Sequence, residues 1–104
     1  MRRGEIWWAV LEPPRNTRPV LLVTRDTAYG HRTHVTIAPL TRSARKIPSH
    51  VSVGPSDGVP TDSVINVDDL QTIPMVQLQR RITELTPLKM AEVDGAIKFA
   101  LALP

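Results

Sequence analysis

Cysteine is absent from the 104 residues of this chain. Neither a disulfide framework nor a thiolate zinc site can therefore form, which fits a reducing compartment. No apolar run approaches the roughly 18 residues that a membrane-spanning helix needs. The basic N-terminus is followed by Glu5 and not by the apolar core of a signal peptide. These absences predict a cytoplasmic protein that has no membrane partner.

Aromatic residues are also scarce, at 4%, and only 41% of the residues are hydrophobic. A chain of this length and composition can build one modest core, so we expect a single domain that spans residues 1–104. There is no internal repeat, low-complexity tract or linker that would divide it. The ten prolines stand between the apolar runs, where they punctuate the chain.

Positive charge is concentrated in the N-terminal half. Residues 1–50 carry nine basic and three acidic residues, a net charge of +6, whereas residues 51–104 carry four and seven, a net charge of −3. Eight of the nine basic residues are arginines, whose planar fork suits phosphates and base edges. This distribution indicates a polyanionic partner such as nucleic acid. A basic surface that is simply solvated is the alternative.

Short apolar runs separated by turn-forming residues predict about five β-strands. We expect them at residues 5–12, 19–24, 34–41, 50–53 and 63–68. One or two helical turns are expected within residues 73–82. Because the strands do not alternate with helices, the pattern favours a small curled antiparallel sheet or open barrel over a parallel sheet.

The strongest helical pattern covers residues 86–103. Thr86 can cap the first turn and Pro87 suits the first helical position. The inward face of this helix is predicted to consist of Val93, Ile97, Ala100 and Leu101. The predicted fold class is therefore mainly β with a C-terminal helix.

The strand expected at residues 5–12 is apolar on both faces. One face presents Ile6, Trp8 and Val10, and the other presents Trp7, Ala9 and Leu11. Such a strand is either buried on both sides within one chain or covered on one side by another chain. Because two adjacent tryptophans do not easily share one small core, we expect a homodimer.

Arg18 and Thr41 form the first candidate site. Arg18 precedes one predicted strand and Thr41 ends another. If these strands are antiparallel neighbours, the start of one lies beside the end of the other, and both residues share a rim. A guanidinium and a hydroxyl at that place can bind one phosphate. A purely structural pair, in which the arginine caps carbonyls, is the alternative.

A basic loop after Thr41 is the second candidate site. Its Arg42, Arg45 and Lys46 suit the phosphates of a nucleic acid, unless they are merely solvated. The loop follows the first candidate site directly along the chain and competes with it as a site for the ligand.

The three histidines are the third candidate. His31, His34 or His50 could carry a proton at an active site. No carboxylate is spaced so as to complete a metal-ligand set with them, and we therefore predict no metal.

Taken in chain order, several segments resemble the MazF/PemK family of toxin ribonucleases. They are RRGEIWWAVL (2–11), RPVLLVT (18–24), VTIAPLT (35–41), DSVINVDDLQTIP (62–74) and the C-terminal TPLKMAEVDGAIKFALAL. Each segment alone is a weak signal, but five in order cover nearly the whole chain. The resemblance implies an SH3-like curled antiparallel barrel with a C-terminal helix, working as a homodimer.

The same resemblance implies a sequence-specific endoribonuclease that cuts single-stranded RNA without metal or cofactor and is inhibited by a cognate MazE-like antitoxin. The family's catalytic arginine falls on Arg18 and its catalytic threonine on Thr41. The candidate RNA contacts are Thr24, Arg42, Ser43, Arg45, Lys46 and Asp69. Attack by the RNA's own 2′-hydroxyl would leave a 2′,3′-cyclic phosphate and a 5′-hydroxyl.

Two features depart from the family pattern. Asp69 stands where relatives often have Gln or Asn, and its carboxylate would repel phosphate but could accept from a cytosine amino group. The connection PPRNT (13–17) is short and is expected to leave the groove more open. The alternative functions are a CcdB-like, non-enzymatic toxin that binds DNA gyrase through the terminal helix, and a plain nucleic-acid-binding module.

Overall fold

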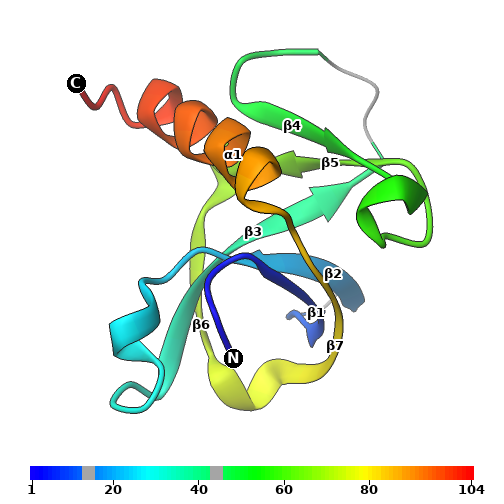
Figure 1. Cartoon of the computed structure of the whole chain (residues 1–104). Coiled ribbons are helices and arrows are strands. Elements are labelled where there is room, and N and C mark those ends of the chain that lie inside the picture. The colour runs from blue at the N-terminus through cyan, green and yellow to red at the C-terminus, as the bar shows by residue number, and fades with distance from the viewer. Residues whose placement is uncertain (13–15, 43–45) are drawn as a thin grey trace.

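The computed structural model describes residues 1–12, 16–42 and 46–104. Figure 1 shows a curled β-sheet with an α-helix lying across it. The elements are β1 (Glu5–Val10), β2 (Thr17–Leu22), β3 (His34–Thr41), β4 (His50–Val53), β5 (Ser63–Asn66), β6 (Gln71–Pro74), β7 (Leu78–Glu84) and α1 (Pro87–Ala100). The prediction of a mainly β fold with a C-terminal helix is confirmed.

All strand pairings of the described sheet are antiparallel, and the strand order is β4–β5–β3–β2–β1–β7. β6 pairs with the first part of β3, and β5 pairs with its end. The strand β3 therefore has two partners along one edge and β2 along the other. This arrangement bends the sheet around β3 and brings the start of β2 to the same rim as the end of β3.

Two predicted strands, 34–41 and 50–53, are confirmed to the residue. Of the one or two helical turns expected within 73–82, the structure has one, the 3₁₀ turn η4 (Met75–Gln77), and the rest of that region belongs to the strands β6 and β7, which were not predicted. The physical reason is that the free edge of β1 pairs with β7, from Glu5 opposite Glu84 to Ala9 opposite Leu78. That pairing overrides the local pattern, as tertiary context often does for strands.

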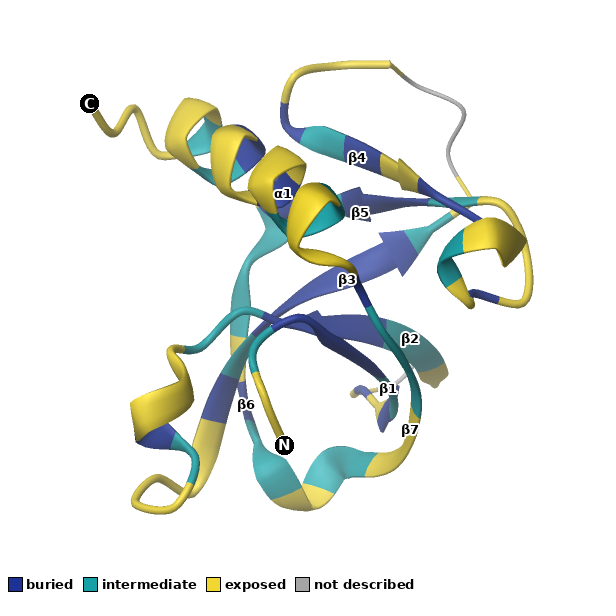
Figure 2. Cartoon of the chain, viewed as in Figure 1, coloured by how far each residue is buried: buried dark blue, intermediate teal, exposed yellow. Residues whose placement is uncertain are grey.

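The sheet carries apolar side chains on both faces, because β1, β2 and β3 each contribute to two separate buried clusters. Leu21 belongs to the cluster under α1, whereas Val20 and Leu22 belong to the second cluster. Ile6 likewise enters the first cluster, and Ala9 enters the second. Figure 2 shows these strands as the darkest part of the molecule. The two-sided apolar pattern of β1 is thus largely satisfied within one chain.

Helix α1 begins as predicted. The Thr86 hydroxyl accepts a hydrogen bond from the backbone N–H of Lys89 at 3.2 Å, and Pro87 occupies the first helical position. Val93 and Ala96 are the buried residues of its inward face. The prediction that Leu101 faces inward is wrong, since the helix ends at Ala100 and Leu101 is 53% exposed. No helix in the described part of the chain has the length and apolar character needed to cross a membrane.

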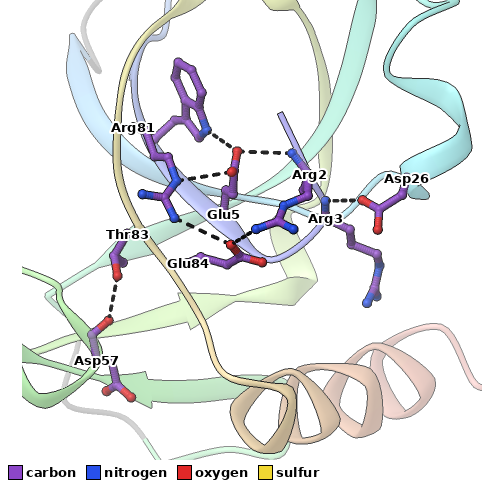
Figure 3. A network of polar contacts seen from close by, with 9 residues as sticks. Arg2, Arg3, Glu5, Asp26, Asp57, Arg81, Thr83 and Glu84 are labelled. Atoms are coloured by element: carbon purple, nitrogen blue, oxygen red, sulfur yellow. Dashed lines mark hydrogen bonds and ion pairs between the residues drawn. The ribbon is translucent and has the colours of Figure 1, made fainter.

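Ion pairs hold the N-terminal segment against β7, as Figure 3 shows for Arg2 and Glu84, and also against α1. Arg2 pairs with Glu84, and Arg3 pairs with Asp94 at 2.7 Å. Glu5 is only 6% exposed and accepts hydrogen bonds from the Trp7 indole and from Arg81. Part of the positive charge of residues 1–50 therefore serves the fold and is already neutralised.

Candidate active site

The β2–β3 ladder brings Arg18 and Thr41 together. Val20 lies opposite Pro39 and Leu21 opposite Ala38. Val20 and Pro39 are the last pair of the ladder, and Arg18 and Thr41 each lie two residues beyond that pair, on the same side of it. Both side chains are half-buried and line the same groove. The geometric expectation that these two residues share one rim is confirmed.

The groove has a volume of about 540 Å³. The sheet contributes Trp8, Pro19 and Leu40 to its lining, next to the polar side chains of Arg18, Thr41 and Arg42. Trp8 lies opposite Pro19 on the neighbouring strand. An aromatic ring and a proline beside an arginine form a surface suited to a base and its phosphate.

The backbone of Arg18 is fixed by strand pairing, and among the described residues its guanidinium has no acidic partner. It lies within β2, opposite the fully buried Ala9 of β1. Among the described residues, no carboxylate lies within 4 Å of the guanidinium of Arg18 or of Arg42. Unlike Arg2 and Arg3, which are paired with acids, the arginines of the groove keep their full charge for a ligand.

The connection between β4 and β5 supplies the rest of the groove, a role that sequence reasoning missed. Val59, Pro60 and Thr61 line the groove from this connection, and Ser63 lines it from the start of β5. Gly58 has a φ of +87° and packs on Thr83 of β7, whose hydroxyl donates to the Asp57 carbonyl at 3.2 Å. Figure 3 shows this contact between the loop and β7. A glycine in a turn was the available signal, since only glycine adopts such a φ readily.

Arg42 and Lys46 extend positive charge away from the groove. Arg42 lines both the groove and a neighbouring hollow of about 520 Å³, which Lys46 and Lys89 also line. The Lys89 ammonium group lies 3.9 Å from the Asp57 carboxylate and 3.2 Å from that of Glu92. The other two predicted contacts of this loop, Ser43 and Arg45, lie outside the described residues, as does most of the PPRNT connection.

The structure does not bring the remaining predicted RNA contacts to this groove. Thr24 follows the far end of β2, six residues and about 20 Å along the chain from Arg18. Its hydroxyl accepts a hydrogen bond from the backbone N–H of Thr36 at 2.7 Å. Asp69 lies in the 3₁₀ turn η3 (Val67–Asp69), where its carboxylate accepts from Gln71 at 3.1 Å.

None of the three histidines lines the groove. His34 begins β3, the strand that Thr41 ends, and is therefore about 23 Å along the strand from Thr41. His31 lies in the loop before it, and His50 begins β4 beside a different hollow. In the described part of the chain, no three His, Asp or Glu residues gather as a possible metal-binding group.

Comparison with known proteins identifies relatives over almost the whole chain. Residues 2–101 match the family model of the PemK-like, MazF-like toxins of type II toxin–antitoxin systems. A protein of Mycobacterium tuberculosis named probable endoribonuclease MazF2 is 39% identical over 99 residues, covering 94% of this chain and 95% of its own. The same organism's endoribonuclease MazF3 is 42% identical over 86 residues, covering 83% and 84%.

Solved structures agree with this relationship. The Mycobacterium tuberculosis toxin MazF-mt6 superposes with a TM-score of 0.88 at 35% identity, covering 96% of this chain and 98% of that chain. A mycobacterial endoribonuclease determined in complex with its cognate antitoxin also gives a TM-score of 0.88, at 30% identity, with 100% and 97% covered. The chain therefore belongs to the PemK-like, MazF-like toxins of type II toxin–antitoxin systems.

Proposed function

We propose that this chain is the toxin of a type II toxin–antitoxin pair and acts as an endoribonuclease on single-stranded RNA, with the groove of Arg18 and Thr41 as its active site. The observation that carries the proposal is that these two residues, each two positions beyond the last pair of the β2–β3 ladder, line one groove in which Arg18 has no acidic partner among the described residues. The names of the relatives, which are endoribonucleases, support the same conclusion.

In the proposed reaction, the 2′-hydroxyl of the RNA attacks the adjacent phosphorus. The bond from phosphorus to the 5′-oxygen breaks, and the products are a 2′,3′-cyclic phosphate and a 5′-hydroxyl. The Arg18 guanidinium stabilises the negative charge that develops on the phosphorane oxygens, through two directed N–H donors. The Thr41 hydroxyl donates to a non-bridging oxygen and fixes the phosphate in place.

Substrate binding is assigned to surfaces around the reacting phosphate. Arg42 and Lys46 attract the flanking phosphates, and the Trp8 ring offers a face for stacking of a base. Because no histidine lines the groove, proton removal from the 2′-hydroxyl is not assigned to His31 or His34 of the same chain.

The proposal extends to assembly and location. One toxin domain of residues 1–104 forms a homodimer in the cytoplasm, where a cognate MazE-like antitoxin inhibits it. A solved relative in complex with its cognate antitoxin supports the partner. The exposed apolar side chains of Leu88, Phe99 and Leu101 on and after α1 support an interface with another chain. Light scattering that finds only an 11.6 kDa monomer at micromolar concentration would exclude the homodimer.

The decisive experiment incubates the purified protein with a long RNA in the presence of EDTA and determines the chemistry of the fragment ends. We expect discrete fragments with 2′,3′-cyclic phosphate and 5′-hydroxyl ends, and none with a folded Arg18→Ala protein as the control. Intact RNA would reject the proposal in favour of a gyrase-binding or plain binding protein. Cleavage that needs a divalent metal would reject the mechanism.

A further inference from the structure

A second concentration of positive charge lies at the opposite end of β2 and β3 from Arg18. It surrounds a hollow of about 290 Å³ between the β2–β3 loop and β6. In Figure 1 the β2–β3 loop is the cyan loop beside β6, remote from the end of β3. The volume is nearly ten times the ~30 Å³ that one water occupies in the liquid, so an anion of several atoms fits with part of its hydration.

Threonine side chains from β3, from β6 and from the loop after β2 line this hollow. Thr24 follows β2, Thr36 lies in β3 and Thr72 lies opposite it in β6. The Thr36 and Thr72 hydroxyls are 2.9 Å apart, and Thr24 accepts from the Thr36 backbone N–H. A hydroxyl both donates and accepts, so the row can turn its protons toward an oxyanion without moving any backbone.

Three basic side chains line the same hollow. Arg25 and Arg32 stand at the two ends of the β2–β3 loop, and His34 begins β3. The Thr33 hydroxyl lies 2.9 Å from Nδ1 of His34, which leaves Nε2 as the ring nitrogen available to a ligand. No acidic residue lines the hollow, and within the described residues neither arginine has a carboxylate within 4 Å. The nearby Asp26 instead accepts from the backbone N–H of Arg3.

The loop that carries the two arginines is built in advance of any ligand. Its 3₁₀ turn, η1 (Asp26–Ala28), is closed by a hydrogen bond from the Ala28 N–H to the Arg25 carbonyl, and Ala28 is buried beneath it. The backbone N–H of Arg32 donates to the Ala28 carbonyl at 3.1 Å. Arg25 and Arg32 are both exposed and line the same hollow, so an anion bound there is attracted by both charges.

We propose that this hollow is a second oxyanion site, specific for a phosphate group, and that it is separate from the groove of Arg18. Arginine forks combined with several hydroxyl donors match the oxygens of a phosphate better than the single charge of chloride. The phosphate comes either from the backbone of a bound RNA, an assignment that rests on the proposed function, or from a free phosphate compound. This phosphate chemistry also gives Thr24 a ligand-binding role away from the groove.

The test is amide and imidazole NMR of the isotope-labelled protein. It is titrated with sodium phosphate, with sodium chloride at matched ionic strength, and with a short 2′-O-methyl oligouridylate, which lacks the nucleophilic hydroxyl and cannot be cut. We expect saturable shifts at Thr36, Thr72 and the His34 ring with phosphate, with the oligonucleotide or with both, but not with chloride. The double variant Arg25→Gln, Arg32→Gln should abolish them, whereas Lys98→Gln, an exposed control, should not.

The two sources are separated by the salt dependence of oligonucleotide binding. If RNA supplies the phosphate, the double variant should reduce the slope of log K against log salt by about 0.7 for each lost contact. An unchanged slope together with saturable phosphate shifts assigns the site to a free phosphate compound. The absence of saturable shifts at these residues with both probes overturns the proposal. This outcome is independent of RNA cleavage, which is measured separately with Arg18→Ala as its control.

Discussion

Gly58 lies directly against Thr83, so that a Cβ added to the glycine would come within 2.8 Å of the threonine Cβ. The contact joins the β4–β5 connection to β7, a strand that pairs with neither β4 nor β5. It therefore fixes the loop that forms one side of the Arg18 groove. Two effects disfavour a side chain at position 58: the positive φ of the backbone and the lack of space next to Thr83.

We expect Gly58→Ala to destabilise the protein by about 1–3 kcal/mol, because a non-glycine residue at positive φ is strained and Thr83 must shift. Gly95→Ala is the matched control, since Gly95 lies in α1 with open space around its Cβ position. That change should stabilise the protein by about 0.5–1 kcal/mol. Urea unfolding of both variants measures the difference, and equal effects of the two changes would contradict the role of the contact.

Arg18→Ala should reduce single-turnover RNA cleavage by about 10²–10³-fold, by analogy with the loss of one preorganised donor to a developing oxyanion. Arg18→Lys should recover only part of this rate, because an ammonium keeps the charge but loses the two-pronged geometry. Circular dichroism verifies that each variant is folded. A folded Arg18→Ala protein that cleaves within about threefold of the wild type would remove Arg18 from the mechanism, since that margin is far below the oxyanion-donor effect.

Thr41 should contribute less than Arg18, because a neutral hydroxyl binds phosphate more weakly than a guanidinium does. Thr41→Val, which keeps the shape and removes the hydroxyl, should slow cleavage measurably, and Thr41→Ser should be nearly silent. The same single-turnover assay compares the two. A Ser variant as slow as the Val variant would show that the hydroxyl is not what Thr41 provides.

Arg42→Gln and Lys46→Gln should weaken RNA binding with little effect on the rate at saturating RNA. Each removes one phosphate contact near the groove, so each should lower the salt slope of binding by about 0.7. Binding isotherms at several salt concentrations, combined with saturating single-turnover rates, separate affinity from chemistry. A variant with normal affinity and no cleavage would instead place that residue in the reaction.

We expect Glu5 to make the free energy of unfolding depend on pH in the acidic range. Burial raises the pKa of its carboxyl, but hydrogen bonds from Trp7, the Arg2 backbone and Arg81, with the nearby N-terminal charge, outweigh burial and hold the pKa below its ordinary value of 4.5. The folded state therefore favours the ionised form, and this stabilisation is present above pH 4.5 and lost as the pH falls through the lowered pKa. Urea midpoints should fall less on acidification in Glu5→Gln than in the wild type, and parallel curves would contradict this assignment.

Features of the fold that depend on residues close together in the sequence could be predicted, whereas features that depend on residues far apart could not. The capped start of α1 at Thr86 and the strands β3 and β4 follow from nearby residues, and each was predicted correctly. The strand at residues 78–84 is set by its pairing with β1, about seventy to eighty positions away, whereas local patterns indicated helical turns within residues 73–82. The residues of a strand such as β7 contain little information about a pairing partner that is remote in sequence.

In the candidate site, too, some features could be predicted from the sequence and others depend on contacts between distant segments. The juxtaposition of Arg18 and Thr41 needed only the assumption that two strands are antiparallel neighbours. The contribution of the β4–β5 loop depends on Gly58 meeting Thr83, a contact between distant segments that no local pattern specifies. Thr24 was expected near RNA as part of a strand, but β2 ends at Leu22, and the chain carries Thr24 to the opposite end of the sheet.

The pairing of β1 with β7 has a consequence for how the chain acquires its structure during synthesis. The first strand finds its second neighbour only when Leu78–Glu84 has been made and released from the ribosome. Until then, the outer edge of β1 presents unpaired backbone groups, and such an edge readily adds a foreign strand. Completion of the sheet is therefore a late event, because the long chain segment between β1 and β7 must be closed into a loop. The nascent chain is most prone to misassembly just before β7 is available.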